Sequence, residues 1–203
     1  KYLFKSENFG EFETGFIPED DRGTLCISSQ IGCTLNCSFC YTGTQKLVRN
    51  LESSEIVGQI AAVKDDLSDW VFKKNNSTKR AISNVVVMGM GEPLMNYKNT
   101  LDAIEKITSP EGLGMSPKRI TVSTSGISKM ILKMADQKPK WNLAVSLHSA
   151  IEETRHKIMP FTEKFALTEL KAALLHWYAQ TKSKITFEYV VWEGINDTEK
   201  EME

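Results

Sequence analysis

The chain has 203 residues, of which 41% are hydrophobic and 25% are charged, and this composition is that of an ordinary folded globular protein. Its 25 Lys and Arg residues nearly balance its 26 Asp and Glu residues, so the net charge of −1 favours no class of partner, although a local basic patch can still attract nucleic acid. No apolar run approaches the roughly 20 residues of a membrane span, so we expect no membrane partner.

The first residues are expected to precede the main domain as an extension. The chain begins at Lys1 without a methionine and ends at Glu203 after a polar run, so we expect it to be a fragment. Residues 1–20, which include the run EFETGFIP, are expected to form a short β-hairpin that leads into the first strand. We therefore divide the chain into an N-terminal hairpin or extension over 1–20 and a main domain over 21–203.

After the hairpin, short apolar runs alternate with stretches of helical periodicity. The apolar runs are typical of strands buried on both faces of a parallel sheet, and they are Thr24–Ser29, Asn84–Met90, Arg119–Ser123, Asn142–Leu147 and Lys184–Trp192. The helical stretches are Ser53–Leu67, Tyr97–Thr108, Ser128–Asp136 and Leu167–Gln180. This alternation predicts a (β/α) barrel or an open α/β sheet. Within Ala62–Arg80, the run KKNNSTKR is expected to lie in a polar surface loop.

Three of the four cysteines lie within eight residues, in the run CTLNCSFC that contains Cys33, Cys37 and Cys40. The chain is too large to need disulfides for stability, so we expect a reducing, cytoplasmic setting in which clustered cysteines bind metal or do redox chemistry. A structural zinc site commonly takes two separated pairs of ligands, and this sequence has no second pair. We favour a 4Fe–4S cluster, because three thiolates would leave one iron free to bind a substrate or cofactor.

Small and polar residues follow the predicted strands, where α/β folds bind ligands. The second strand runs into GMGEP, in which the glycines allow close approach of the backbone and Glu92 supplies an acceptor. The third and fourth strands run into STSG and SLHS. Each run has a structural explanation by itself, and His148 alone is more typical of a buried structural histidine. Together they predict a ligand site at one rim of the sheet.

The cysteine spacing CxxxCxxC, followed by Gly91-Glu92-Pro93, resembles the radical S-adenosylmethionine enzymes. The runs IPEDDRGTLCISSQIGCTLNCSFCYTG, MGMGEPLMN, VSTSG and SLHS narrow the resemblance to the RNA methyltransferases of the RlmN and Cfr family. CSFCYTGTQ and the later RNL are closer to the C2-methylating RlmN branch, and the match runs from about Glu13 to Asp197. This resemblance implies an α/β fold, a partial (β/α)6 barrel with about five of six βα units, preceded by the hairpin and truncated at its C-terminal end.

The resemblance also implies two cofactors, a 4Fe–4S cluster and S-adenosylmethionine. The cluster ligands would be Cys33, Cys37 and Cys40. Gly91 and Glu92 would hold the methionine amino group of S-adenosylmethionine. The residues lining its ribose and adenine would be Ser123, Ser146, Leu147 and His148.

The implied reaction is methylation of C2 of adenine in 23S rRNA, in the peptidyl-transferase region, and in tRNA beside the anticodon. One S-adenosylmethionine would methylate a cysteine near the C-terminus, and a radical made from a second one would activate that methyl group. Cys26 would be the resolving thiol that forms a disulfide on release, and Glu13 the acidic candidate for removing the ring proton. An electron donor such as flavodoxin and a monomeric state complete these expectations.

The sequence departs from the family at one point, because no cysteine follows Cys40. The methyl-carrying cysteine, the sixth strand and an N-terminal accessory domain are therefore expected to lie outside this chain. Alternatives are a Cfr-like C8 methyltransferase, a radical enzyme with another substrate, and an RNA-binding module that a metal merely stabilises. Cys26 alone is also typical of a small buried apolar residue, and Glu13 of a solvated carboxylate.

Overall fold

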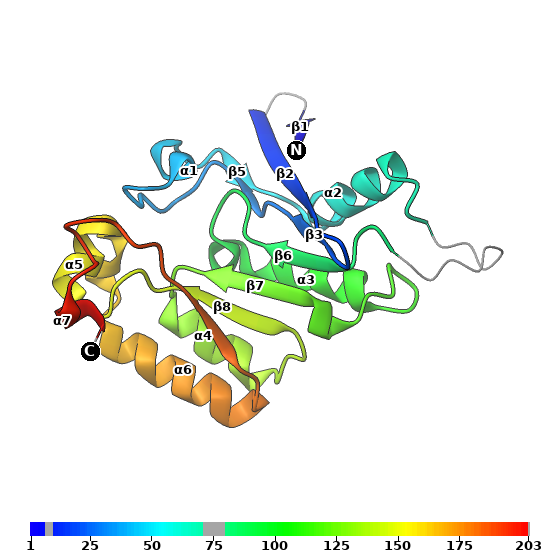
Figure 1. The fold of residues 1–203 in the computed structure, drawn as a ribbon. Coiled ribbons are helices and arrows are strands. Elements are labelled where there is room, and N and C mark those ends of the chain that lie inside the picture. The colour runs from blue at the N-terminus through cyan, green and yellow to red at the C-terminus, as the bar shows by residue number, and fades with distance from the viewer. Residues whose placement is uncertain (7–9, 71–79, 203) are drawn as a thin grey trace.

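The computed structural model describes residues 1–6, 10–70 and 80–202, and its main feature is one sheet of seven strands in the order β1-β2-β3-β6-β7-β8-β9 (Figure 1). The hairpin strands β1 (Tyr2–Ser6) and β2 (Gly10–Pro18) are antiparallel, and β2 also pairs antiparallel with β3 (Gly23–Cys26). The remaining strands run parallel to β3, and they are β6 (Asn84–Val87), β7 (Ile120–Thr124), β8 (Asn142–Ser146) and β9 (Ile185–Glu188).

Helices connect the parallel strands, and the four longer ones flank the sheet along the length of its strands (Figure 1). These are α2 (Ser53–Asp66), α3 (Tyr97–Thr108), α4 (Ser128–Asp136) and α6 (Leu167–Thr181). The shorter elements are α1 (Tyr41–Thr44), α5 (Glu152–Ile158), α7 (Glu199–Met202), the two-stranded sheet of β4 (Gln30–Ile31) and β5 (Arg49–Asn50), and three 3-10 helices, Pro93–Asn96, Pro117–Arg119 and Pro160–Lys164. Within the described part of the chain, none of the helices has the length and apolarity that a bilayer crossing requires.

The strand register sorts the side chains of the parallel sheet onto two faces, because successive residues of a strand point in opposite directions. The face packed against the longer helices is apolar, and its buried residues include Leu25, Val85, Val87, Ile120, Val122, Leu143 and Val145. The opposite face is more polar toward the carboxyl ends of the strands, where it carries Cys26, Ser123, Ser146 and Glu188. Hydrophobic burial on one face therefore stabilises the sheet, and the other face is left for polar groups.

The structure confirms the predicted α/β fold, with five parallel strands alternating with helices behind an antiparallel hairpin. All the predicted strands and helices are present, but several strands are shorter than predicted. The run Lys184–Trp192 leaves the sheet after Glu188, since the Val190 N–H donates to His148 Nδ1 at 3.2 Å. Residues 62–66 of the predicted loop are helical, and most of KKNNSTKR lies outside the described residues.

Candidate active site at the carboxyl ends of the strands

The predicted site residues come together at one end of the parallel sheet. The arrowheads of β6, β7 and β8 point toward the side of the molecule that holds α1, α5 and α7 (Figure 1). The cysteine loop follows β3, GMGEP follows β6, Ser123 lies near the end of β7, and Ser146 ends β8. Topology alone thus gathers segments that are more than 100 residues apart in the sequence.

The cysteine loop is closed at its base by backbone pairing. β4 and β5 bring Ile31 opposite Arg49, and Cys33 forms an isolated bridge with Lys46. Inside the loop, the Cys40 N–H donates to the carbonyl of Cys37 at 3.2 Å. A Cβ at Gly43 would lie 2.8 Å from the Cys37 carbonyl oxygen, so only glycine fits this turn. The loop is consequently a defined structure rather than a flexible connection.

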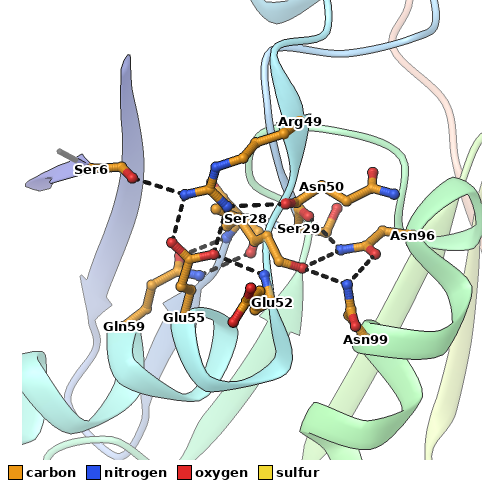
Figure 2. Close-up of polar contacts among 11 residues, drawn as sticks. Ser6, Ser28, Ser29, Arg49, Asn50, Glu52, Glu55, Gln59, Asn96 and Asn99 are labelled. Carbon is orange, nitrogen blue, oxygen red and sulfur yellow. Dashed lines mark hydrogen bonds and ion pairs between the residues drawn. The ribbon is translucent and has the colours of Figure 1, made fainter. Parts of the chain in front are cut away.

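Two buried amides hold the backbone that enters and leaves this loop (Figure 2). The Gln59 side chain on α2 accepts from the Ser28 N–H at 2.8 Å and donates to the Ser28 carbonyl at 2.9 Å. The Asn96 amide donates to the carbonyls of Ser29 and Leu51, at 2.8 Å and 2.7 Å. A buried amide that satisfies two main-chain carbonyls ties both segments to the helical layer.

Arg49 adds a charged anchor beside these amides (Figure 2). Its guanidinium pairs with Glu55 through both nitrogens at 2.7 Å and donates to Ser6 Oγ at 2.8 Å. The hydrogen bond from Arg49 holds the pKa of the Glu55 carboxyl below its usual range. Glu55 also accepts from the Glu52 N–H at 2.8 Å, so this pair fixes β5, the hairpin and the start of α2 together.

The three clustered thiols make an unfavourable site for thiolates unless a metal binds there. Burial, followed by repulsion from Cys40 and Cys33, raises the pKa of Cys37 to about 12. Burial also raises the pKa of Cys33, which lies within electrostatic reach of Glu92. Soft thiolate donors suit iron–sulfur clusters, and the positive charge of the iron ions would offset the repulsion between the thiolates. The donor set of the loop therefore fits the predicted cluster.

The zinc alternative fits this geometry less well. Within residues 1–6, 10–70 and 80–202, no three side chains of His, Cys, Asp or Glu are arranged to hold a single metal ion. A structural zinc ion needs its ligands to converge on one point, whereas the cysteines of a 4Fe–4S cluster bind different irons. The cysteines are all free thiols, so the expected disulfide of Cys26 is not supported.

Glu92 is a buried carboxylate that has no cationic partner within the described part of the chain. Its side chain accepts from the Ser125 N–H at 2.7 Å and the Leu94 N–H at 2.9 Å, and the residue is 2% exposed. Burial raises the pKa of Glu92 in spite of these hydrogen bonds. No basic side chain of the described residues contacts it. A buried carboxylate left in this state favours the ammonium group of a ligand.

Gly91 places this carboxylate. Its backbone has φ +94°, in the region that glycine favours, and a Cβ there would lie 2.4 Å from the Cβ of Gln30. The Gln30 Oε1 accepts from the Glu92 N–H at 2.9 Å, so the loop after β6 is bonded to the strand that precedes the cysteines. The tight approach of these two loops requires glycine at position 91.

Glu188 is a site residue that the sequence did not reveal. Its carboxylate accepts from Ser123 Oγ at 2.8 Å and from Ser146 Oγ at 3.0 Å. Burial raises the pKa of the nearby Cys26 thiol, and the charge of Glu188 adds to that effect. The run KITFEYVVW does contain a signal for it. A single carboxylate within an apolar strand must point away from the hydrophobic core, toward the polar face of the sheet.

The two residues that follow Ser146, Leu147 and His148, have different surroundings. His148 is 4% exposed, has φ +57°, and packs edge-on against the ring of Phe39 at 4.8 Å. Burial lowers the pKa of His148, which keeps the imidazole neutral. The side chain of Leu147 instead lines an apolar cavity of about 570 Å³ between α6 and β9. The backbone of Leu147 bonds to the loops of the site, because its N–H donates to the main-chain carbonyl of Glu188 and its carbonyl accepts from Arg155.

Glu13 and Cys26 lie on the same face of neighbouring strands. Gly15 of β2 pairs directly with Cys26 of β3, and a Cβ at Gly15 would lie 3.8 Å from that of Cys26. Glu13 shares the Gly15 face by strand alternation, while Thr14 points the other way and donates to Gln59. Glu13 pairs with Lys1 at 2.6 Å, and its side chain is 44% exposed. The carboxylate is accessible to solvent beside the site.

The chain is similar to several known proteins. Residues 27–202 match the family model described as the Radical SAM superfamily. The "Probable dual-specificity RNA methyltransferase RlmN" of Flavobacterium psychrophilum is 59% identical over 94% of this chain and 53% of that protein. The "Dual-specificity RNA methyltransferase RlmN" of Parvibaculum lavamentivorans is 50% identical over 93% of this chain and 47% of that protein.

The solved structure of a radical SAM methyltransferase from Sphaerobacter thermophilus is also similar. It has a TM-score of 0.90 and 36% identity, and the match covers 98% of this chain and 56% of that one. The chain thus spans about half the length of the curated relatives that it matches.

Proposed function

The chain belongs to the radical SAM superfamily, and on this premise we propose that it forms most of the catalytic barrel of an RNA methyltransferase that methylates C2 of adenine. The names of its relatives support RNA as the substrate class, and we propose 23S rRNA and tRNA as the two substrates. Within the chain, we propose residues 1–20 as an N-terminal extension and 21–203 as the radical SAM core. The remaining barrel strand, the methyl-carrying cysteine and the accessory domain would lie in the part of the relatives that this chain does not span.

One observation carries the proposal: a three-cysteine loop lies within electrostatic reach of a buried carboxylate to which the described residues offer no cation. Cys33, Cys37 and Cys40 would hold a 4Fe–4S cluster, which when bound supplies the electron that cleaves S-adenosylmethionine. Glu92 would bind the methionine ammonium through a charge-assisted hydrogen bond. This pairing would place the ligand beside the cluster.

The polar face of the sheet would orient the rest of the ligand. Ser123 and Ser146 donate to the same oxygen of Glu188, so their hydroxyl lone pairs stay free to accept from ligand hydroxyl groups. His148 would contribute a neutral ring beside the adenine. Burial and the charge of Glu188 favour the protonated thiol of Cys26. This thiol would release the methylated RNA by forming a disulfide with the methyl-carrying cysteine outside this chain.

Glu13 would accept the proton that the adenine ring loses, because it lies on the Cys26 face and is open to solvent. Its ion pair with Lys1 is exposed and therefore weak, so that carboxylate can change partner without a large cost. We further propose a flavodoxin-like electron donor, a monomeric state and a cytoplasmic location, the last because the cysteines need a reducing setting.

The test is anaerobic reconstitution of the protein with iron and sulfide, followed by reduction in the presence of S-adenosylmethionine. We expect iron binding and reductive cleavage to be lost together in Cys33→Ala, Cys37→Ala and Cys40→Ala. Cys26→Ala is the matched control, since Cys26 is a half-buried cysteine outside the loop, and the variant should bind iron normally. Equal iron loss in Cys26→Ala and Cys37→Ala would contradict these roles.

The RNA step is tested in the complete protein. Mass spectrometry of digested RNA should find methyl groups at C2 of adenine, whereas methylation at C8 would favour the Cfr-like alternative. Cys26→Ala should accumulate protein that is covalently attached to RNA, visible as a nuclease-sensitive shift on a denaturing gel, because release needs the second thiol. Normal turnover by Cys26→Ala would mean that another thiol resolves the product.

A further inference from the structure

Arg155 is a fully buried cation at the carboxyl end of the sheet. It lies on α5 and is 1% exposed, and its hydrogen bonds to the described residues all go to backbone carbonyls. The Nη2 group donates to the Ser125 carbonyl at 2.7 Å and to the Ser146 carbonyl at 3.4 Å, and Nε donates to the Leu147 carbonyl at 3.1 Å. These acceptors belong to the loops after β7 and β8, so the guanidinium joins two loops of the candidate site.

The described residues provide this cation with no direct anionic partner. No ion pair among them includes Arg155. Glu152 is on the same helix, but its half-exposed carboxylate accepts from the Leu167 N–H and approaches His156 instead. Glu92 is separated from Arg155 by the backbone of Ser125, whose N–H donates to Glu92 and whose carbonyl accepts from Arg155. Burying a charge in this way is unfavourable unless an anion offsets it.

The cysteine loop would supply such an anion when it binds a cluster, and it is joined to the helix that carries Arg155. Ser38 donates from its N–H at 2.9 Å and from its Oγ at 3.0 Å to the carbonyl of Ile158, the last residue of α5. Cys37 packs in one buried cluster with Ile158 and Met159. Arg155 lies one helical turn before Ile158, and a thiolate at Cys37, as in a bound cluster, would act favourably on its charge. The pKa of Arg155, lowered by burial to about 10, still leaves the guanidinium charged at neutral pH.

We propose that Arg155 is a positioning residue for the 4Fe–4S cluster, offsetting the negative charge of its thiolates from the Cys37 side while it joins the loops after β7 and β8. This inference rests on the proposed function, since it requires the cluster to be bound by the cysteine loop. Uptake of one electron from the donor adds one negative charge to the cluster. A fixed positive charge nearby stabilises that reduced form, so Arg155 raises the reduction potential.

The experiment is a potentiometric titration of the reconstituted protein, followed by electron paramagnetic resonance of the reduced cluster. In Arg155→Gln, the ratio of reduced to oxidised cluster at a fixed potential should fall by about tenfold, which corresponds to a midpoint lower by about 59 mV. Arg155→Lys keeps the charge but loses most of the carbonyl bonds, so it should stay close to the wild type. Lys157→Gln removes an exposed cation from the same helix and should leave the midpoint unchanged.

The variants separate the charge from the loop contacts. An equal shift in Arg155→Lys and Arg155→Gln, or no shift in either, would overturn the inference, as would loss of iron from both. Loss of iron from Arg155→Gln alone would support it, since the charge would then be needed to assemble the cluster. A wild-type protein without an iron–sulfur signal would overturn the proposed function and this inference with it, whereas a normal signal with an unmoved midpoint would overturn this inference alone.

Discussion

Two buried carboxylates at opposite ends of the parallel sheet behave in opposite ways. Asp69, at the amino end, is 7% exposed and accepts from the N–H groups of Ala81 and Ile82 at 2.6 Å and 3.0 Å. The Lys64 ammonium lies 3.0 Å from the same carboxylate. Glu92, at the carboxyl end, also accepts from two N–H groups but has no ammonium beside it among the described residues.

The depth of burial and the neighbouring ammonium group together distinguish the two sites. Burial raises the pKa of both carboxyls, but the N–H groups of Ile82 and Ala81 together with Lys64 bring the pKa of Asp69 below its ordinary value. The pKa of Glu92 stays raised. A carboxylate that the chain itself neutralises is part of the fold, and one that the chain leaves unneutralised can bind a ligand. The following variants test this distinction.

The largest effect is expected at the amino end. Asp69→Ala would leave the Lys64 ammonium and the N–H groups of Ala81 and Ile82 without their acceptor, and removing one partner of a buried pair costs about 3–5 kcal/mol. We expect the free energy of unfolding in urea to fall by that amount. Glu19→Ala removes an exposed carboxylate that pairs with Arg22, and its urea midpoint should not move. Equal midpoints for the two variants would show that Asp69 is not structural.

Glu92→Ala should instead weaken ligand binding. A hydrogen bond to a charged group contributes about 1.5–3 kcal/mol, so the affinity for S-adenosylmethionine should fall roughly ten- to a hundredfold in calorimetry of the reconstituted protein. The iron content should not change. Asp69→Asn is the matched control, a change at a buried carboxylate remote from the cysteine loop, and it should bind with wild-type affinity. An unaltered affinity in Glu92→Ala would mean that the run GMGEP is only a structural turn and does not bind the ligand.

The two carboxylates also predict pH dependences of opposite sign. Asp69 has a folded pKa below its ordinary 3.8, so its stabilising contribution is complete above that value and is lost as the pH falls through the folded pKa. Glu92 has a folded pKa above its ordinary 4.5, so its contribution declines as the pH rises from that value through the folded pKa. Each group changes the slope of stability by at most about 1.4 kcal/mol per pH unit.

Urea unfolding of Asp69→Asn and Glu92→Gln between about pH 3 and about pH 8 measures these slopes. Asp69→Asn should lose less stability in acid than the wild type, and Glu92→Gln should lose less between acid and neutral pH. Profiles parallel to that of the wild type would mean that the carboxylates titrate alike in the folded and unfolded chains.

Local patterns predicted the features that depend on local sequence. Apolar runs such as NVVV of β6 predicted the parallel strands, because only buried strands need continuous apolar residues. The spacing of the cysteines predicted one loop, and glycine in GMGEP predicted a close backbone approach, which Gly91 makes against Gln30. Strand alternation also predicts that the side chains of Ser146 and Leu147 point in opposite directions, although the family resemblance implies that both line the ligand.

Features that depend on distant neighbours could not be predicted. Glu188 bonds to Ser123, 65 residues earlier in the chain, so its role exists only after the sheet has formed. Arg155 lies in a helix of seven residues with charged positions throughout, which is too short for a periodic apolar pattern. The partners of both charges are set by tertiary packing. The apolar run KITFEYVVW marks Glu188 as unusual without giving its partners, and the sequence around Arg155 resembles an ordinary polar stretch.

The smallest effect is expected from Ser123→Ala. This variant tests whether the site at the carboxyl end of the sheet binds S-adenosylmethionine mainly through Glu92 or through all its polar groups equally. The Ser123 hydroxyl donates to Glu188 at 2.8 Å, and Ser146 donates to the same oxygen at 3.0 Å, so removing one leaves the other in place. A typical hydrogen bond contributes about 1 kcal/mol net, and we expect a roughly fivefold loss of affinity for S-adenosylmethionine with little change in the urea midpoint.

Ser146→Ala should lose the same affinity as Ser123→Ala. The double variant should lose more binding free energy than the sum of the two single variants, because Glu188 would then be left without either donor. A loss in Ser123→Ala as large as that in Glu92→Ala would instead mean that the hydroxyl itself holds the ligand and that the uncompensated charge of Glu92 is not the main source of affinity.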